Sequence, residues 1–218
     1  MAQLFPRHAT TLFRGGILLA LVLAAAAAFL AYALPRSDRA WRVGVPEPQP
    51  VPFSHGHHVG GLGIDCRYCH DSVERAAFAG MPPAETCMSC HSQVWTAAAA
   101  LAPIQRGYEL DEPIVWTSVH RLPEFARFHH GIHVSRGVGC ETCHGRVDRM
   151  PETVKAETLS MGWCLECHRD PGPRLRPPEA VFVMGWEPTP AEAGAATDLA
   201  DHHGVAVGQL TDCTVCHD

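Results

Sequence analysis

The sequence of 218 residues predicts a mostly α-helical and irregular fold, in which short helices and loops follow one N-terminal transmembrane helix. Three observations lead to this prediction. Nineteen glycines and 18 prolines leave little room for long regular elements. All ten cysteines fall in five copies of Cys-x-x-Cys-His, and residues 16–34 carry no charged side chain. We therefore expect a small body with little strand, built around the five copies and tethered by a helix.

The uncharged run at 16–34 is close to the roughly 20 residues that span a bilayer. Arg7 and Arg14 precede it, and Ala31-Tyr32-Ala33 resembles a signal-peptidase site, so a cleaved signal peptide is the alternative. The length of the run is more typical of a membrane anchor than of a signal peptide. We expect an uncleaved anchor, with a cytoplasmic N-terminus at residues 1–15.

The segment at 35–50 contains most of the sequence "VPEPQPVP" and is predicted to be an extended, semi-rigid linker. The net charge of −6 includes two arginines before residue 35, so the rest of the chain carries −8. No basic patch indicates a nucleic-acid partner. The acidic balance is consistent with ordinary solubility or with docking to a basic redox partner.

Each Cys-x-x-Cys-His copy has the spacing of a c-type haem attachment site, where two thiols bind the vinyl groups and the histidine binds iron. The predicted attachment residues are Cys66, Cys69, Cys87, Cys90, Cys140, Cys143, Cys164, Cys167, Cys213 and Cys216. The predicted proximal iron ligands, which define motifs 1 to 5 in chain order, are His70, His91, His144, His168 and His217. Zinc knuckles or disulfides would not require these histidines. The sequence therefore predicts five c-type haems, whose macrocycles form much of the core.

A segment before motif 1 recurs before motif 3. Residues 53–59 and 128–134 both read Phe-x-His-Gly-x-His-Val, and a glycine-bearing turn and a Cys-x-x-Cys-His follow in each. Val-Glu-Arg at 73–75 and Val-Asp-Arg at 147–149 lie at the same offset from the histidine of their motif. A second motif then follows in both copies. The repetition predicts two homologous dihaem modules.

The rest of the chain is divided around these modules. The predicted parts after the linker are dihaem module 1 at 51–95, a connector at 96–125, dihaem module 2 at 126–170, and a C-terminal segment at 171–218 that holds the fifth haem. The boundaries follow from the repeat and from the position of motif 5.

A low-spin haem needs a distal ligand as well as a proximal one, commonly histidine or methionine. Two histidines three residues apart can point into different haem pockets, so each repeated turn is expected to join two haems. The predicted distal ligands are His55, His58, His120, His130 and His133, with Met161, His202 and His203 as less certain alternatives. His57 and His129 break the pattern between the copies and are not expected to bind iron.

The histidine turn before Cys-x-x-Cys-His resembles the class III multihaem cytochromes c, whose histidine pair ligates two different haems. "FSHGHHVGGLGIDCRYCH", "PAETCMSCH", "FHHGIHVSRGVGCETCHGRVDRM", "LSMGWCLECHRDP" and "LTDCTVCHD", together with the anchor, resemble more closely the pentahaem subunit of alternative complex III. The resemblance is weakest over 175–205. It implies a membrane quinol:electron-acceptor oxidoreductase with integral membrane quinol-binding subunits, an iron–sulfur subunit, and a monohaem cytochrome c or another periplasmic electron acceptor.

Three functions fit the predicted cofactors. An electron-transfer subunit without its own catalytic residues is favoured, because the distal histidines can fill every iron. A multihaem reductase would need an open coordination position. A stand-alone quinol dehydrogenase would have to build its quinol site from one helix. Because c-type haem is attached on the outer face of the cytoplasmic membrane, we expect a single-pass protein of that membrane with its haem domain on the periplasmic side.

Overall fold

The computed structural model describes residues 5–6, 8–190 and 196–217, and the chain divides into two units, Met1–Arg42 and Val43–Asp218. Arg7, part of the predicted basic N-terminal segment, lies outside the described residues. Each unit is held together by its own contacts. The boundary falls inside the predicted linker at 35–50.

The first unit is dominated by the helix α1, Ala9–Ala33, which continues as the 3₁₀ turn η1, Leu34–Arg36. No side chain of α1 is buried, and the helix is long and apolar enough to cross a membrane. It begins seven residues before the uncharged run, because an apolar run marks only the part of a helix that lacks charge. The Arg36 guanidinium lies over the Tyr32 ring at 4.0 Å and donates to the Tyr32 carbonyl, which satisfies one C-terminal carbonyl.

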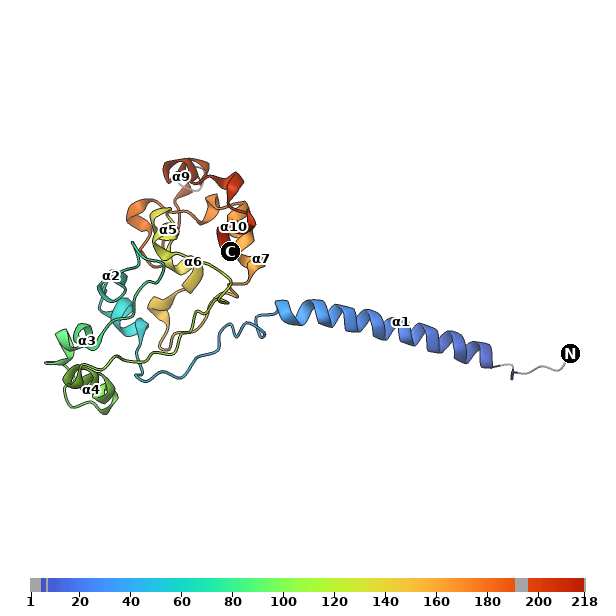
Figure 1. Ribbon diagram of the computed structural model, residues 1–218, viewed down its shortest axis with the longest axis horizontal. Coiled ribbons are helices and arrows are strands. Elements are labelled where there is room, and N and C mark those ends of the chain that lie inside the picture. Colours follow the sequence, from blue (N-terminus) through green and yellow to red (C-terminus); the bar gives the residue numbers. More distant parts are fainter. Residues whose placement is uncertain (1–4, 7, 191–195, 218) are drawn as a thin grey trace. The chain divides into compact units, whose positions relative to one another are not determined.

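The second unit consists of short helical pieces joined by loops (Figure 1). Its helices in chain order are η2 (Gly56–Gly61, a π-helix), α2 (Cys66–Cys69), α3 (Ala84–His91), η3 (Ala99–Leu101), α4 (Ala102–Leu110), α5 (His130–Ser135), α6 (Cys140–His144), η4 (Val147–Arg149), α7 (Met161–Arg169), η5 (Gly172–Arg174), η6 (Pro178–Ala180), α9 (Ala196–His202), η7 (Val207–Gln209) and α10 (Cys213–Cys216). The described residues form no strand, and their only β contacts are two isolated bridges. The predicted mostly helical and irregular architecture is confirmed.

The side-chain core of the second unit is small. Val51, Ala84, Leu101 and Ile104 form a buried cluster where α3 packs against α4. No large side chain among the described residues is less than 2% exposed. A body of this size would ordinarily bury larger apolar side chains, so its interior is suited to enclosing apolar groups other than its own side chains.

The two repeated turns pack reciprocally, each against the loop after the other repeat's first motif. The Gly56 amide in η2 donates to the Met150 carbonyl at 2.8 Å, and the Gly131 amide in α5 donates to the Ala76 carbonyl at 3.1 Å. Each acceptor lies six residues after the histidine of its motif. The two repeated segments therefore pack against each other with approximate two-fold symmetry and do not form separate domains.

Glycine in these turns allows the close approach. A Cβ on Gly131 would lie 2.8 Å from the Glu74 carbonyl oxygen, and one on Gly60 would lie 2.1 Å from the Asp148 carbonyl oxygen. Side chains at these positions would collide with backbone, so the glycines are required by packing.

Candidate haem-binding sites

The five Cys-x-x-Cys-His motifs lie on the short helices α2, α3, α6, α7 and α10. A helical turn places residues three and four apart on one face, so the two thiols and the histidine can meet one ligand. Local caps start two of these helices: Asp65 accepts from the Arg67 amide before α2, and Ser160 accepts from the Trp163 amide before α7. All ten cysteines lie within the described residues as free thiols, so the disulfide alternative is not supported.

Four motif histidines face a histidine from a repeated turn. The ring centroids are 6.5 Å apart for His55 and His70, 6.2 Å for His58 and His91, 6.3 Å for His130 and His144, and 6.2 Å for His133 and His168. Two metal–imidazole bonds of roughly 2 Å each, together with the half-width of each ring, span roughly 6 Å. The four pairs therefore have the separation needed to hold one iron each between two imidazoles.

Four of the five motif histidines are oriented by backbone carbonyls. The Nδ1–H groups of His70, His91, His168 and His217 donate to the carbonyls of Gly80 (2.7 Å), Val94 (3.1 Å), Leu210 (2.9 Å) and Phe125 (2.9 Å), respectively. A carbonyl can only accept, so Nδ1 carries the proton and Nε2 keeps its lone pair. This is the arrangement that a metal-binding imidazole requires.

The turn histidines are held in the same way. His58 donates from Nδ1 to the Ser54 carbonyl, His133 to the His129 carbonyl, each at 2.9 Å, and His130 to the Ala77 carbonyl at 2.8 Å. His55 Nδ1 instead lies 2.8 Å from the Thr153 hydroxyl oxygen. In all four, Nε2 is free to face the partner imidazole.

Burial keeps several of these imidazoles neutral. Desolvation, followed by the neighbouring His70, lowers the pKa of His55 to about 4, and desolvation, followed by His120, lowers the pKa of His144 to about 3. Desolvation also lowers the pKa of His130 and of His133. A neutral imidazole is the form that binds a metal, so proton competition for these ligands is weak near neutral pH.

His120, the fifth predicted distal ligand, lies beside the motif histidine His144. Its ring packs edge-on against His144, with ring centroids 4.3 Å apart and planes 74° apart, which is too close for an iron between them. Desolvation, followed by Lys155, lowers its pKa to about 4. The prediction relied on sequence position between the modules, whereas the chain folds back here and places His120 beside motif 3.

Motif 5 is held by the segment directly before α5. The Arg127 amide donates to the Cys216 carbonyl, and its guanidinium donates to the carbonyls of Thr214 and His217 at 2.7 and 2.8 Å. Among ring contacts of the described residues, His217 meets only Phe125, at 6.0 Å. No imidazole therefore faces the fifth motif histidine in the described part of the chain.

The alternative ligands Met161, His202 and His203 lie in different surroundings. Met161 is the first residue of α7 and is exposed, and His202 ends α9 with its ring 5.1 Å from that of His203. His203 is buried, and its Nε2–H donates to the Arg176 carbonyl at 2.8 Å. The prediction of His203 as a possible iron ligand is therefore not supported, because the nitrogen that would bind iron is already protonated and engaged.

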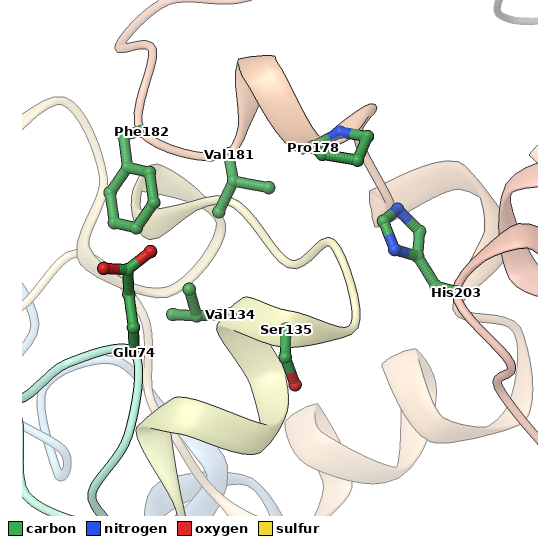
Figure 2. A pocket seen from close by; sticks show the side chains of 7 residues that line it. All are labelled: Glu74, Val134, Ser135, Pro178, Val181, Phe182 and His203. Carbon is green, nitrogen blue, oxygen red and sulfur yellow. The ribbon is translucent and has the colours of Figure 1, made fainter.

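A cavity of about 290 Å³ lies among Glu74, Val134, Ser135, Pro178, Val181, Phe182 and His203. Figure 2 shows Val181 and Phe182 on one side of the space and Glu74 with Val134 on the other, with His203 at its far edge. No facing imidazole pair lines it, and its single imidazole is engaged. The cavity therefore lacks the ligands of a haem site.

Several residues that orient the ligands could not have been found from the sequence. Thr153, Ala77 and Leu210 lie 98, 53 and 42 residues from the histidines that they contact. Two of the three contribute only a backbone carbonyl, which any residue carries. No motif signals such a contact, because it depends on how the chain folds back.

Comparison with known proteins supports a multihaem cytochrome c. No family model matches the chain. It is 33% identical over 141 residues to the menaquinone reductase, multiheme cytochrome c subunit, of Nitratidesulfovibrio vulgaris (strain Hildenborough), covering 55% of this chain and 67% of the relative. The chain itself has five Cys-x-x-Cys-His motifs, a helical and irregular body and an apolar N-terminal helix. It belongs to the family of multihaem c-type cytochromes that this subunit represents.

Proposed function

We propose that this chain binds five c-type haems, one at each motif, and transfers electrons as a membrane-anchored subunit of a quinone-linked oxidoreductase. Haems 1 to 5 are named after the motifs that would attach them. When bound, each haem supplies an iron that carries one electron as it alternates between the ferric and ferrous states. The chain supplies ligands, spacing and electrostatic surroundings, and quinone chemistry is assigned to partner subunits.

The observation that carries this proposal is the set of four facing imidazole pairs. An iron held between two imidazoles would have no open position for a substrate at haems 1 to 4, which favours electron transfer over a reductase activity at those sites. His55 and His58 would serve haems 1 and 2, and His130 and His133 would serve haems 3 and 4. Each turn would thereby hold two neighbouring haems at a fixed separation.

Contacts between motifs support a linear order of haems 2, 1, 3, 4 and 5. Motifs 2 and 1 meet through the Tyr68 and Ser89 hydroxyls, 2.7 Å apart. Motifs 1 and 3 meet at the centre of the two-fold arrangement, where the Cys66 and Cys140 thiols are neighbours. The central pair would therefore be haems 1 and 3.

The remaining contacts extend the order to haems 4 and 5. Burial, followed by the thiolates of Cys167 and Cys164, raises the pKa of the Cys143 thiol to about 12, so motifs 3 and 4 are neighbours. Burial, followed by Cys216, likewise raises the pKa of Cys164, which places motif 5 beside motif 4. The bond from His168 to the Leu210 carbonyl joins the same two regions. Haems 2 and 5 would be the two ends at which electrons enter and leave.

For haem 5 we favour Met161 over His120 as the distal ligand. Met161 lies one helical turn before Cys164 on α7 and therefore on the same face as that thiol, which neighbours motif 5. His120 Nε2 is buried without a hydrogen-bond partner, but its ring packs edge-on against His144 rather than facing His217. A methionine ligand would give haem 5 a higher reduction potential than a bis-histidine haem. Replacing Met161 with alanine should lower the potential of one haem, and His202→Ala should not.

The identity of the complex rests on two resemblances. The motif pattern resembles the pentahaem subunit of alternative complex III, which implies quinol oxidation with integral membrane, iron–sulfur and monohaem cytochrome c partners. The relative in N. vulgaris is named as a subunit of a menaquinone reductase. Purification of the native complex and identification of its subunits would distinguish an alternative complex III from a menaquinone reductase. A chain purified alone from the membrane would support the stand-alone quinol dehydrogenase instead.

Haem number and membrane attachment are tested on the mature protein. The intact mass should exceed that of the polypeptide by five haems, and N-terminal sequencing should find α1 still attached, on a protein whose haem domain faces the periplasm. Three haems or fewer would contradict the proposal. A mature N-terminus at Leu34 would show that the apolar segment is a cleaved signal peptide.

The ligand assignment is tested with His130→Ala and His133→Ala. Each variant should convert one haem to high-spin or water-ligated iron, and electron paramagnetic resonance (EPR) should show the loss of a different low-spin signal in each. The covalent attachment should survive, because the thiols are untouched. If both variants lose the same signal, or neither loses one, the turn does not join two haems.

A further inference from the structure

The four facing imidazole pairs differ in one respect. The planes of the two rings are 9° apart in His55–His70, 12° in His130–His144 and 24° in His133–His168. In the pair of His58 and His91 they are 61° apart. The proposed haem 2, at one end of the order, would therefore have strongly twisted axial ligands.

The twist does not come from the turn histidine. His58 stacks on Phe53 with centroids 4.4 Å apart and planes 25° apart, and the equivalent His133 stacks on Phe128 at 4.5 Å and 29°. Both donate from Nδ1 to the carbonyl four residues earlier at 2.9 Å. The repeat therefore presents its second histidine in the same way in both copies.

The motif histidines of these two pairs are held differently. His168 donates to the carbonyl of Leu210, 42 residues further along the chain. His91 donates to the carbonyl of Val94, in the turn that follows its own helix, at 3.1 Å. The acceptor sets the direction of the Nδ1–H bond and with it the plane of the ring. The local acceptor at Val94 accounts for the different orientation of His91.

Trp95 holds that turn in an uncommon conformation. Its φ is +59°, in the left-handed region that side chains other than glycine, asparagine and aspartate seldom adopt. Its exposed ring stacks on His57, with centroids 6.4 Å apart and planes 14° apart. The Val94 carbonyl, which accepts from His91, belongs to the peptide that enters this turn. Neither Trp95 nor His57 has a counterpart in the second copy.

We infer that the left-handed turn at Trp95 is a positioning device that twists His91 relative to His58 and makes haem 2 electronically distinct from the other bis-histidine haems. This inference rests on the proposed iron ligation. Two parallel imidazoles interact with the same iron d orbital and separate its energy from that of a second d orbital. Twisted imidazoles interact with both d orbitals, so the energies of the two orbitals stay closer together. Twisted ligands therefore give a more anisotropic low-spin EPR signal and, because orbital separation stabilises ferric iron, favour a higher potential.

The wild-type spectrum is the first test. Oxidised holoprotein should show one highly anisotropic low-spin signal beside rhombic signals, and His58→Ala should remove the anisotropic one. Four rhombic bis-histidine signals without an anisotropic one would overturn the inference while leaving the proposed ligation intact. Absence of bis-histidine signals altogether would instead overturn the proposed function.

Two substitutions at Trp95 separate its backbone from its side chain. Proline cannot adopt a positive φ, since its ring fixes φ near about −65°, so Trp95→Pro must move the Val94 carbonyl. Glycine adopts a positive φ freely, so Trp95→Gly keeps the turn and removes only the ring. Trp95→Pro should shift the anisotropic signal toward a rhombic one, and Trp95→Gly should leave it in place.

Redox titration of the same samples gives a second readout. The potential of haem 2 should fall in Trp95→Pro and stay unchanged in Trp95→Gly, while the other signals keep their positions. An unchanged spectrum in Trp95→Pro would overturn the inference, and so would loss of the anisotropic signal in Trp95→Gly, since the ring and not the turn would then orient the ligand. If the Trp95→Pro variant does not acquire its haems, the EPR spectra of the wild-type protein and of Trp95→Gly still test the inference.

Discussion

The turns before motifs 1 and 3 hold their histidines alike, but the surroundings of those motifs differ. In both turns the second residue of the repeat caps the fifth: the Ser54 hydroxyl accepts from the His57 amide, and His129 Nδ1 accepts from the Ile132 amide. This explains why His129, which was not expected to bind iron, is present. The two turns therefore share the scaffold that orients their histidines, including a polar cap before each pair.

The difference lies in the residue after the first cysteine of each motif. Arg67 in motif 1 pairs with Asp65 in an exposed position. Glu141 in motif 3 binds Arg176, which is buried, and also lies 3.6 Å from Arg146. Segments outside the repeat thus give two equivalent sites different electrostatic surroundings. Differences among the haems should be sought in these segments, and four substitutions test the comparison between the shared turns and their different surroundings.

Arg176→Ala should have the largest effect. Arg176 donates to Glu141 and to the Val183 carbonyl, and its loss would leave a carboxylate in a largely buried place with the Gly185 amide and Arg146 as its remaining partners. We expect a loss of about 3 kcal/mol in the free energy of unfolding. Thermal and denaturant unfolding measure it. Adding Glu141→Gln should recover part of the loss, and a cost below about 1 kcal/mol for the single variant would contradict the role given to this pair.

Gly60→Ala should have the next largest effect. Its Cβ would meet the backbone carbonyl of Asp148, which cannot move without shifting η4, so we expect a loss of about 2 kcal/mol. Gly56→Ala is the matched control in the same turn, because its nearest neighbour would lie at 3.2 Å. Equal unfolding midpoints for the two variants would show that the reciprocal packing of the repeats is looser than described.

Thr153→Val should have a smaller and more local effect. The Thr153 hydroxyl is the one side-chain partner among the Nδ1 bonds of the four turn histidines. Without it His55 would donate less electron density to iron, so the potential of haem 1 should rise while the free energy of unfolding changes by about 1 kcal/mol. Redox titration measures the shift. Thr153→Ser should restore the original potential, and a shift of several haems at once would argue against a local contact.

Arg67→Ala should have the smallest effect. Its pair with Asp65 is exposed and its stack on Phe182, at 4.3 Å, lies at the surface. Exposed ion pairs contribute little because water and salt screen them. The unfolding midpoint should not move beyond experimental error. If Arg67→Ala lowered the free energy of unfolding as much as Arg176→Ala, motifs 1 and 3 would have equivalent electrostatic surroundings.

The motif spacing, the repeat and the apolar run are local features, which is why the sequence alone determined the haem chemistry, the candidate ligands and the helical, irregular architecture. Attachment to c-type haem needs only neighbouring residues on one turn of chain. The same locality explains the identification of His55, His58, His130 and His133, because their repeated spacing is visible without a fold.

Only the tertiary structure decided which imidazole faces which motif, how each ring is oriented, and where His120 and His203 lie. These outcomes depend on contacts between residues tens of positions apart, many of them made by backbone carbonyls that leave no mark in the sequence. The reciprocal packing of the two turns is of the same kind: each glycine is visible in the sequence, but the carbonyl that it must avoid belongs to the other copy. Sequence determined the chemical groups, and the fold determined their partners, because ligand spacing is local and ligand orientation is not.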